Sequence, residues 1–175
     1  MERLTLVKPG PEHEAEVLVY RDEMLAAASV LNGMGTLRDM VGYAQWLQDC
    51  RRMENEEMLP PDTVTAEQYL YVREADGRVV GMIQFRHTLN AALASHGGHI
   101  GYSVRPSERR KGYAKRMLAA CLAKCRERGL TRVLVTCLAE NEASRRVILA
   151  NGGKLENAVY APEKGATFER YWIEP

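Results

Sequence analysis

The N-terminal half of the chain changes from helical spacing of apolar residues to strict alternation. Apolar side chains recur at helical spacing after residue 12, whereas Leu70 and Val72 alternate with tyrosines, and such alternation is typical of a half-buried strand. The pair Asp76-Gly77 between two alternating runs indicates a β-hairpin. The pattern predicts strands at 2–8, 68–74 and 78–87, helices at 12–31 and 36–53, and a connection with a short helical turn at 88–96.

The C-terminal half contains the clearest helix, at 112–128, where apolar residues lie three and four positions apart. The nearly unbroken β-prone run within 132–138 is typical of a strand buried on both faces, as in a parallel pair. A strand at 99–104 precedes the helix, so this part forms one right-handed crossover. A helix at 141–151 and strands at 154–160 and 168–174 are predicted to follow.

This order of elements predicts the fold class. It is α+β: a mixed, mostly antiparallel central sheet with one parallel step, flanked by helices. The length of 175 residues fits a single domain, 1–175, with its own apolar core.

The charge balance changes the picture of possible partners. Lys and Arg number 24 and Asp and Glu 23, which leaves a net charge of +1 and no strong field to hold nucleic acid or an anionic membrane. No apolar stretch approaches the roughly 20 residues of a membrane helix, and the charged start is unlike a secretory signal. We expect a cytoplasmic protein without nucleic-acid or membrane partners; monomer and homodimer both stay open.

The four cysteines fit this expectation. Cys121 and Cys125 lie on one predicted helix face and Cys137 lies in a strand-like run, without any Cys-x-x-Cys pair. We interpret them as small buried hydrophobic residues in a reducing compartment. His96 and His99 are the one close histidine pair, and we expect no metal site there.

The segment that carries chemistry is 104–114, where a strand ends, a glycine-containing loop follows and the long helix begins. Helix N-termini offer unpaired N–H groups and the positive end of a dipole, so they suit anions. Gly112 lets a large group approach the backbone, and Arg110, Lys111 and Lys115 add positive charge. The pattern describes a pyrophosphate cradle; the alternative is a plain strand-to-helix turn with basic surface residues. Neither the P-loop nor the Gly-x-Gly-x-x-Gly pattern is present.

Arg109-x-x-Gly112-x-Ala114 resembles the Arg/Gln-x-x-Gly-x-Gly/Ala signature of GCN5-related N-acetyltransferases (GNAT). The resemblance extends back to Val104-Arg105-Pro106, at the end of the family's central strand, and forward to the family's second motif, here 141–144 and 151–153. The stretches 86–90 and 97–102 also resemble a bacterial subgroup of predicted acetyltransferases for which no firm substrate is known.

The resemblance implies acetyl-coenzyme A as co-substrate, bound where the two parallel strands splay apart. Asn141 and Ser144 would face the pantetheine from the far strand, although Asn141 also suits a plain helix N-cap. Arg145 and Arg146 would serve the coenzyme phosphates or form a solvated helix face. The backbone of Tyr102, Ser103 and Val104 would pair with the pantetheine, one group polarising the thioester carbonyl, and the pyrophosphate would lie on the N–H groups of Arg109, Arg110, Lys111, Gly112, Tyr113 and Ala114.

The implied reaction is direct attack of a primary amine on the thioester in a ternary complex, with no metal. An ammonium has a pKa near 10, so a base must take its proton. His99 is our first candidate for the base, and the alternatives are His87, Glu74 and Glu140, or a structural histidine.

The second motif departs from the family at residue 148. Many members have a tyrosine there that protonates the leaving thiolate, and this chain has Ile148. Tyr102 or Ser144 would replace that acid, or the thiolate would leave unassisted, because its pKa lies close to the 8.5 or so of cysteine.

Two functions from different classes remain open at this stage. The first is an N-acetyltransferase that acts on an amine acceptor, either a small molecule or a peptide. The alternative is a non-catalytic acyl-coenzyme A binding or sensing module. The resemblance places the acceptor near residues 30–36, 86–98 and 157–167 and does not identify it.

Overall fold

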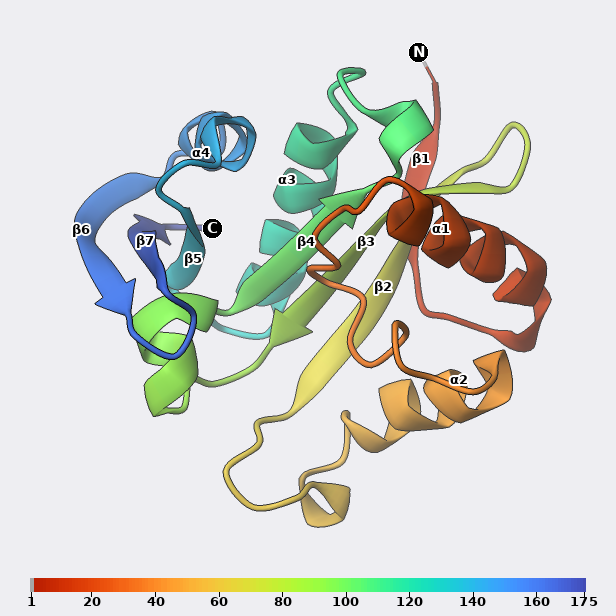
Figure 1. Cartoon of the computed structure of the whole chain (residues 1–175), viewed down its shortest axis with the longest axis horizontal. Helices are drawn as coiled ribbons and strands as arrows, with labels where there is room; N and C mark the ends of the chain where they lie inside the picture. Colours follow the sequence, from red (N-terminus) through yellow and green to blue (C-terminus); the bar gives the residue numbers. More distant parts are fainter. Residues whose placement is uncertain (1) are drawn as a thin grey trace.

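Seven strands in residues 2–175, the part of the chain that the computed structural model describes, form two antiparallel sheets. The first has the order β1-β2-β3-β4 and the second the order β5-β7-β6 (Figure 1). The strands are β1 Leu4–Val7, β2 Ala66–Arg73, β3 Arg78–Arg86, β4 Ile100–Val104, β5 Val133–Leu138, β6 Lys154–Ala161 and β7 Ala166–Ile173. The helices are α1 Glu14–Ala26, α2 Tyr43–Arg52, α3 Tyr113–Glu127 and α4 Glu142–Leu149, with short turns η1 Pro11–His13, η2 Glu56–Met58, η3 Leu93–Gly97 and η4 Pro106–Glu108.

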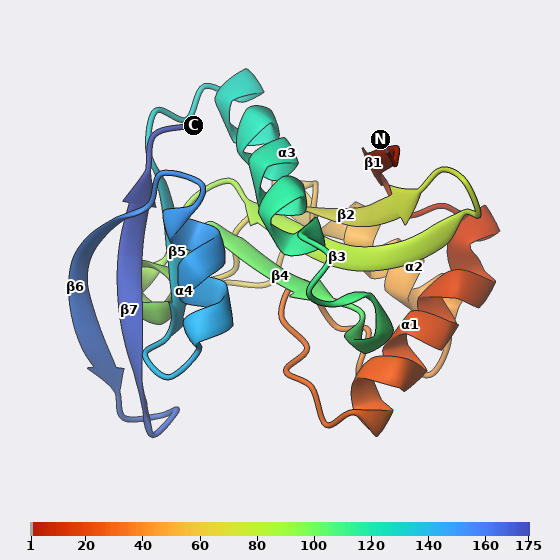
Figure 2. The same ribbon diagram turned by 90° about the horizontal axis from the view of Figure 1, so that it is seen from above.

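β4 and β5 begin side by side and then separate. The N–H of His99 donates to the carbonyl of Leu134 at 2.8 Å, and no ladder continues the pairing, so each strand belongs to a different sheet. Figure 2 shows the two sheets with α4 beside β5, on the side that faces β4. The splayed pair predicted from the sequence is confirmed, and the single expected sheet is divided in two at this point.

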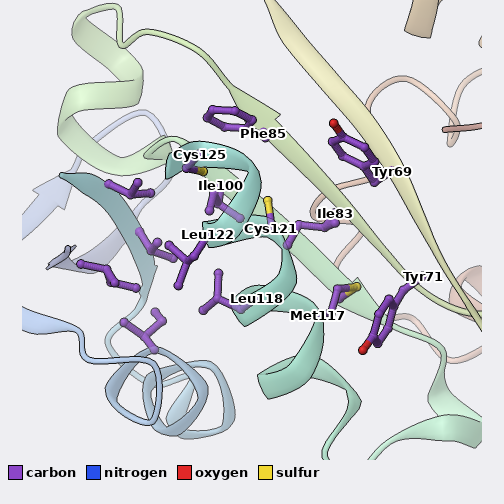
Figure 3. Close-up of a cluster of buried hydrophobic side chains, with 14 of the residues drawn as sticks. Tyr69, Tyr71, Ile83, Phe85, Ile100, Met117, Leu118, Cys121, Leu122 and Cys125 are labelled. Atoms are coloured by element: carbon purple, nitrogen blue, oxygen red, sulfur yellow. The ribbon is translucent and has the colours of Figure 1, made fainter. Parts of the chain in front are cut away.

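The helices cover both faces of the first sheet. α3 packs on one face over an apolar cluster that includes Met117, Cys121 and Cys125 (Figure 3), whereas α1 and α2 cover the opposite face around Tyr20, Trp46 and other buried residues. The spacing of three and four residues on α3 therefore faces the core, as predicted. All four cysteines are buried and free.

The two N-terminal helices are shorter than predicted. α1 ends at Ala26 and α2 begins only at Tyr43, because Met34 and Leu37 reach the core from an irregular segment instead of a helix. The indole of Trp46 donates to the carbonyl of Met34 at 3.0 Å and fixes that segment. The segment 27–42 crosses β4: a Cβ placed at Gly33 would lie 2.4 Å from the carbonyl oxygen of Gly101, so only glycine fits there.

No helix in residues 2–175 is long and apolar enough to cross a membrane. The same residues contain no cluster of three or more His, Cys, Asp or Glu side chains that is arranged to hold a metal ion.

Candidate active site

The connection between β4 and α3 presents a run of unpaired backbone N–H groups. Arg110 and Gly112 have φ angles of 64° and 79°, a left-handed conformation that costs a non-glycine residue about 1–2 kcal/mol. The N–H groups of residues 110–115 have no acceptor within residues 2–175. They lie at the N-terminus of α3, and successive N–H groups in such turns form a concave anion site. This geometry suits an anion such as phosphate.

A buried arginine ties the start of this loop to α1. Arg105 is 1% exposed, and its guanidinium donates to Glu23 at 2.7 Å and to Glu16 at 3.0 Å. Glu23 also accepts the N–H of Ser107 at 2.7 Å. Burial raises the pKa of Glu23, but the hydrogen bonds from Ser107 and Arg105 outweigh it and lower the pKa to about 2. Glu23 is therefore ionised at neutral pH and holds the loop in place.

Sequence reasoning did not single out these α1 carboxylates. Glu16 and Glu23 lie seven residues apart, two turns along one helix face. That spacing is the only signal in the sequence, and many solvated helix faces share it.

A second charged group supports the middle of the loop. Glu108 is 4% exposed and lies 3.1 Å from Arg73, 3.0 Å from Arg78 and 2.8 Å from Lys111. Burial raises the pKa of Glu108, and the hydrogen bonds from Lys111 and Arg73 lower it by more. Lys111 is thus engaged with its own loop, whereas Arg110 is exposed and forms no ion pair in the described chain.

Two residues predicted at the cofactor direct their side chains elsewhere. Arg109 donates through Nε to the carbonyl of Val104 at 3.0 Å and through Nη2 to Ser29 at 2.9 Å, and its own N–H donates to a carbonyl in the preceding turn at 3.3 Å. The hydroxyl of Tyr113 donates to Glu2 at 2.7 Å. Arg109 therefore shapes the loop, and Tyr113 borders the cradle with its backbone alone.

β4 is the last strand of its sheet, so one edge is open. In an antiparallel pair, residues whose backbone groups bond the neighbouring strand alternate with residues whose backbone groups point away from it. The carbonyl of His99 accepts from β3 at 2.7 Å and the N–H of Arg105 donates to β3 at 3.0 Å. The odd-numbered residues of β4 are therefore the ones that bond β3. The backbone groups of Tyr102 and Val104 therefore point to the open edge, and those of Ser103 point to β3.

The side chain of Tyr102 spans the space between β4 and α4. Its hydroxyl lies 2.7 Å from Oγ of Ser144, and burial raises its pKa well above the usual value for tyrosine. Asn141 caps α4, because its Oδ1 accepts the N–H of Ser144 at 3.0 Å. The structure thus brings together three of the predicted residues across the splay.

His99 joins the two sheets. Its Nδ1 accepts the N–H of Leu134 at 2.9 Å, and burial lowers the pKa of its imidazole. A neutral imidazole has one nitrogen with a free lone pair. In His99 that nitrogen is Nδ1, so the proton lies on Nε2. This arrangement gives His99 a positioning role and argues against the expected base.

The other expected bases and the acid position lie in different surroundings. Nδ1 of His87 is 2.9 Å from Oγ1 of Thr65, and burial lowers the pKa of its ring. Glu74 and Glu140 are exposed. Ile148 lies on the core-facing side of α4 and is fully buried, and its hydrocarbon side chain has no proton to donate.

The two arginines of α4 form ion pairs. Arg145 donates to Glu169 on β7 at 2.7 Å, and Arg146 pairs with Glu142 one turn earlier on the exposed face of α4. Their side chains are thus engaged within the described chain.

Comparison with known proteins identifies the family. The sequence model of the acetyltransferase (GNAT) family matches residues 40–152, so the chain belongs to this family of acetyl-coenzyme A-dependent acetyltransferases. No curated protein matches the chain in sequence.

Solved structures share the fold at low sequence identity. The ribosomal-protein-S5-alanine acetyltransferase from Vibrio fischeri has a TM-score of 0.73 and 13% identity, covering 99% of this chain and 94% of that one. RimJ from Mycobacterium smegmatis in complex with CoA-disulfide has a TM-score of 0.71 and 20% identity, covering 98% and 81%. An acetyl transferase from Salmonella typhimurium, which modifies the N-terminal serine of 50S ribosomal subunit protein L7/L12, has a TM-score of 0.68 and 17% identity, covering 98% and 95%.

Proposed function

We propose that the protein transfers the acetyl group of acetyl-coenzyme A to a primary amine by direct attack in a ternary complex. The observation that carries this proposal is the run of unpaired N–H groups at 110–115, with left-handed backbone at Arg110 and Gly112. A strained non-glycine residue persists only where the surrounding structure fixes it, and such residues gather at ligand clamps. The pyrophosphate of the coenzyme fits the concave cradle that they form.

The open edge of β4 suits the pantetheine arm. Tyr102 presents its N–H and carbonyl to this edge, and Val104 presents its N–H there as well. The carbonyl of Val104 already accepts from Arg109. Pairing with this edge continues the sheet by one strand-like segment. One of these N–H groups polarises the thioester carbonyl and stabilises the charge that develops on it.

The amine reaches the thioester in its neutral form. Its proton leaves through water, since the lone pair of His99 is engaged by Leu134. A tyrosine hydroxyl, with an ordinary pKa of about 10, carries its proton at neutral pH, and burial raises the pKa of Tyr102 further. This hydroxyl, which lies against Oγ of Ser144, serves as the acid for the leaving thiolate.

The rival function is a module that binds acyl-coenzyme A without turnover. It is favoured by the absence of a tyrosine at 148 and by the engaged nitrogen of His99. Both functions require the cradle, and they differ only in chemistry. The four free and buried thiols fit a reducing compartment, and we place the protein in the cytoplasm on that ground.

One experiment separates the two functions. Acetyl-coenzyme A binding is measured by calorimetry, and release of the free coenzyme thiol is followed with a panel of primary amines. The enzyme releases thiol faster with at least one amine than in buffer. If acetyl-coenzyme A binds but no amine increases thiol release, the protein is the binding module. If acetyl-coenzyme A does not bind, both functions are overturned.

A further inference from the structure

A cavity of about 210 Å³ opens beside the end of β3. It lies between the segment that precedes β2 and the β3–β4 connection with η3, the green helical turn near β6 and β7 in Figure 1. Its wall combines apolar side chains with few polar groups, and includes Met53, Val64, Leu93, Asn90, Asp62 and Arg86. Small-molecule sites share this mixture, but their volume is usually about 300 Å³ or more, so this cavity suits only a small ligand.

Arg86 is the cation of this wall and has no anionic partner. Its Nη1 donates to the carbonyls of Gly97 and Gly98, both at 3.2 Å. Nε and Nη2 have no acceptor within residues 2–175, and neither is fully enclosed by protein atoms. Burial is the one cause that shifts the pKa of Arg86, and it shifts it downward. Asp62 lies in the same wall, but Arg86 forms no ion pair within residues 2–175. A partly buried guanidinium with spare donors provides the planar fork that binds a carboxylate.

The position of Arg86 relates the cavity to the proposed acetyl site. A Cβ placed at Gly101 would lie 3.3 Å from Nη2 of Arg86, so the guanidinium lies against the bare backbone of β4. The next residue is Tyr102, whose backbone we propose to pair with the pantetheine arm. Arg86 therefore lies against the strand residue that directly precedes the proposed pantetheine edge.

We infer that this cavity binds the carboxylate of the acceptor through Arg86, and that the acceptor is a free amino acid or a close analogue with its amine a few bonds from a carboxylate. The inference rests on the proposed acetyl transfer and specifies its substrate class. A peptide N-terminus lacks that nearby carboxylate, so the cavity selects against it.

The first test uses the unmodified protein. The protein is saturated with coenzyme A and titrated calorimetrically with N-acetyl-L-amino acids and with the matching N-acetyl carboxamides. A charge-assisted hydrogen bond predicts that at least one acid binds roughly 10- to 100-fold more tightly than its amide. Equal binding of acid and amide across the panel, or no binding of any acid, would overturn the inference.

The second test assigns the effect to Arg86. Arg86→Gln should abolish the preference for acid over amide and leave the affinity for acetyl-coenzyme A unchanged, whereas Arg86→Lys should retain part of the preference. Asp62→Asn is the matched control, since it removes a charge from the same wall and should leave acid binding equal or tighter. If Arg86→Gln unfolds, the Arg86→Lys and Asp62→Asn pair still decides the assignment. A preference as large as that of the parent, either in a folded Arg86→Gln protein or in the Arg86→Lys protein, would overturn it.

Turnover distinguishes the two proposals. If the free amino acids release no thiol although their N-acetyl forms bind with the predicted preference, the carboxylate site stands and the enzymatic function is refuted. If simple amines or amino-acid amides release thiol as fast as the free amino acids, the enzymatic function stands and the carboxylate site is refuted.

Discussion

Gly112 is the position at which the cradle is most directly tested. Its φ is 79°, and a Cβ built there meets no heavy atom within 4 Å. A longer side chain therefore does not clash with the protein and projects into open space beside the unpaired N–H groups. Gly112→Glu places a carboxylate where we propose the pyrophosphate, and Gly112→Gln is its neutral isostere.

The two variants share one effect and differ in another. Both force a non-glycine residue into the left-handed region, which lowers stability by about 1–2 kcal/mol. Only glutamate adds a charge, and two like charges about 5 Å apart repel by about 1–3 kcal/mol for effective dielectric constants between roughly 80 and 20. The affinity of the glutamate variant for acetyl-coenzyme A should thus be about 5- to 150-fold below that of the glutamine variant.

Calorimetry with acetyl-coenzyme A measures this difference, and thermal melts confirm that both variants fold equally. The gap between them should narrow as salt is raised, because ions screen exposed charges. Equal affinities for Gly112→Gln and Gly112→Glu would mean that no phosphate lies near residue 112, and the proposed cradle would be refuted.

Four further substitutions, at three residues, test other parts of the site. His99→Ala leaves the buried N–H of Leu134 without an acceptor and should lower the free energy of unfolding by about 1–3 kcal/mol. His99→Asn offers an acceptor in a similar place, and a large loss of turnover in a stable His99→Asn protein would restore His99 as the base. Tyr102→Phe removes the hydroxyl bonded to Ser144 and should lower turnover at unchanged coenzyme affinity, and a rate within twofold of the parent would exclude Tyr102 as the acid. The pKa of Glu23 is lowered from 4.5 to about 2, so its contribution to stability is complete above pH 4.5 and disappears as the pH falls to 2; denaturant titrations of Glu23→Gln should show less loss over that interval, and identical acid curves would contradict the role of Glu23.

The elements that were predicted well are those whose apolar residues repeat at one regular spacing because they face one apolar core. α3 carries its buried residues at three- and four-residue spacing, and the hairpin of β2 and β3 turns at Asp76-Gly77 as the sequence indicates. The segment 27–42 was predicted poorly because apolar residues there reach the core without a helix. Apolar residues of an irregular segment can show the same spacing as those of a helix. In this segment the backbone also turns at Gly33 and Gly35, whose φ angles are positive.

In the candidate site, the positions of backbone groups could be predicted from the sequence better than the directions of side chains. A glycine after a strand and before a long helix indicates where unpaired N–H groups gather. The sequence left a plain strand-to-helix turn open beside the cradle, and the resemblance to the GNAT family favoured the cradle. The directions of Arg109 and Tyr113 depend on Ser29 and Glu2, which lie some 80 and 111 residues away in sequence. No local pattern contains such partners.

The same reasoning explains why the sequence pointed to His99 as a base and the structure does not. A histidine on a central strand has two nitrogens, and only its neighbours decide which one keeps a free lone pair. Here the neighbour is a backbone N–H of β5, which approaches His99 only because the two sheets meet there. The histidine thus fixes the point from which β4 and β5 diverge. The cleft that we propose for the pantetheine exists because that contact ends after one residue.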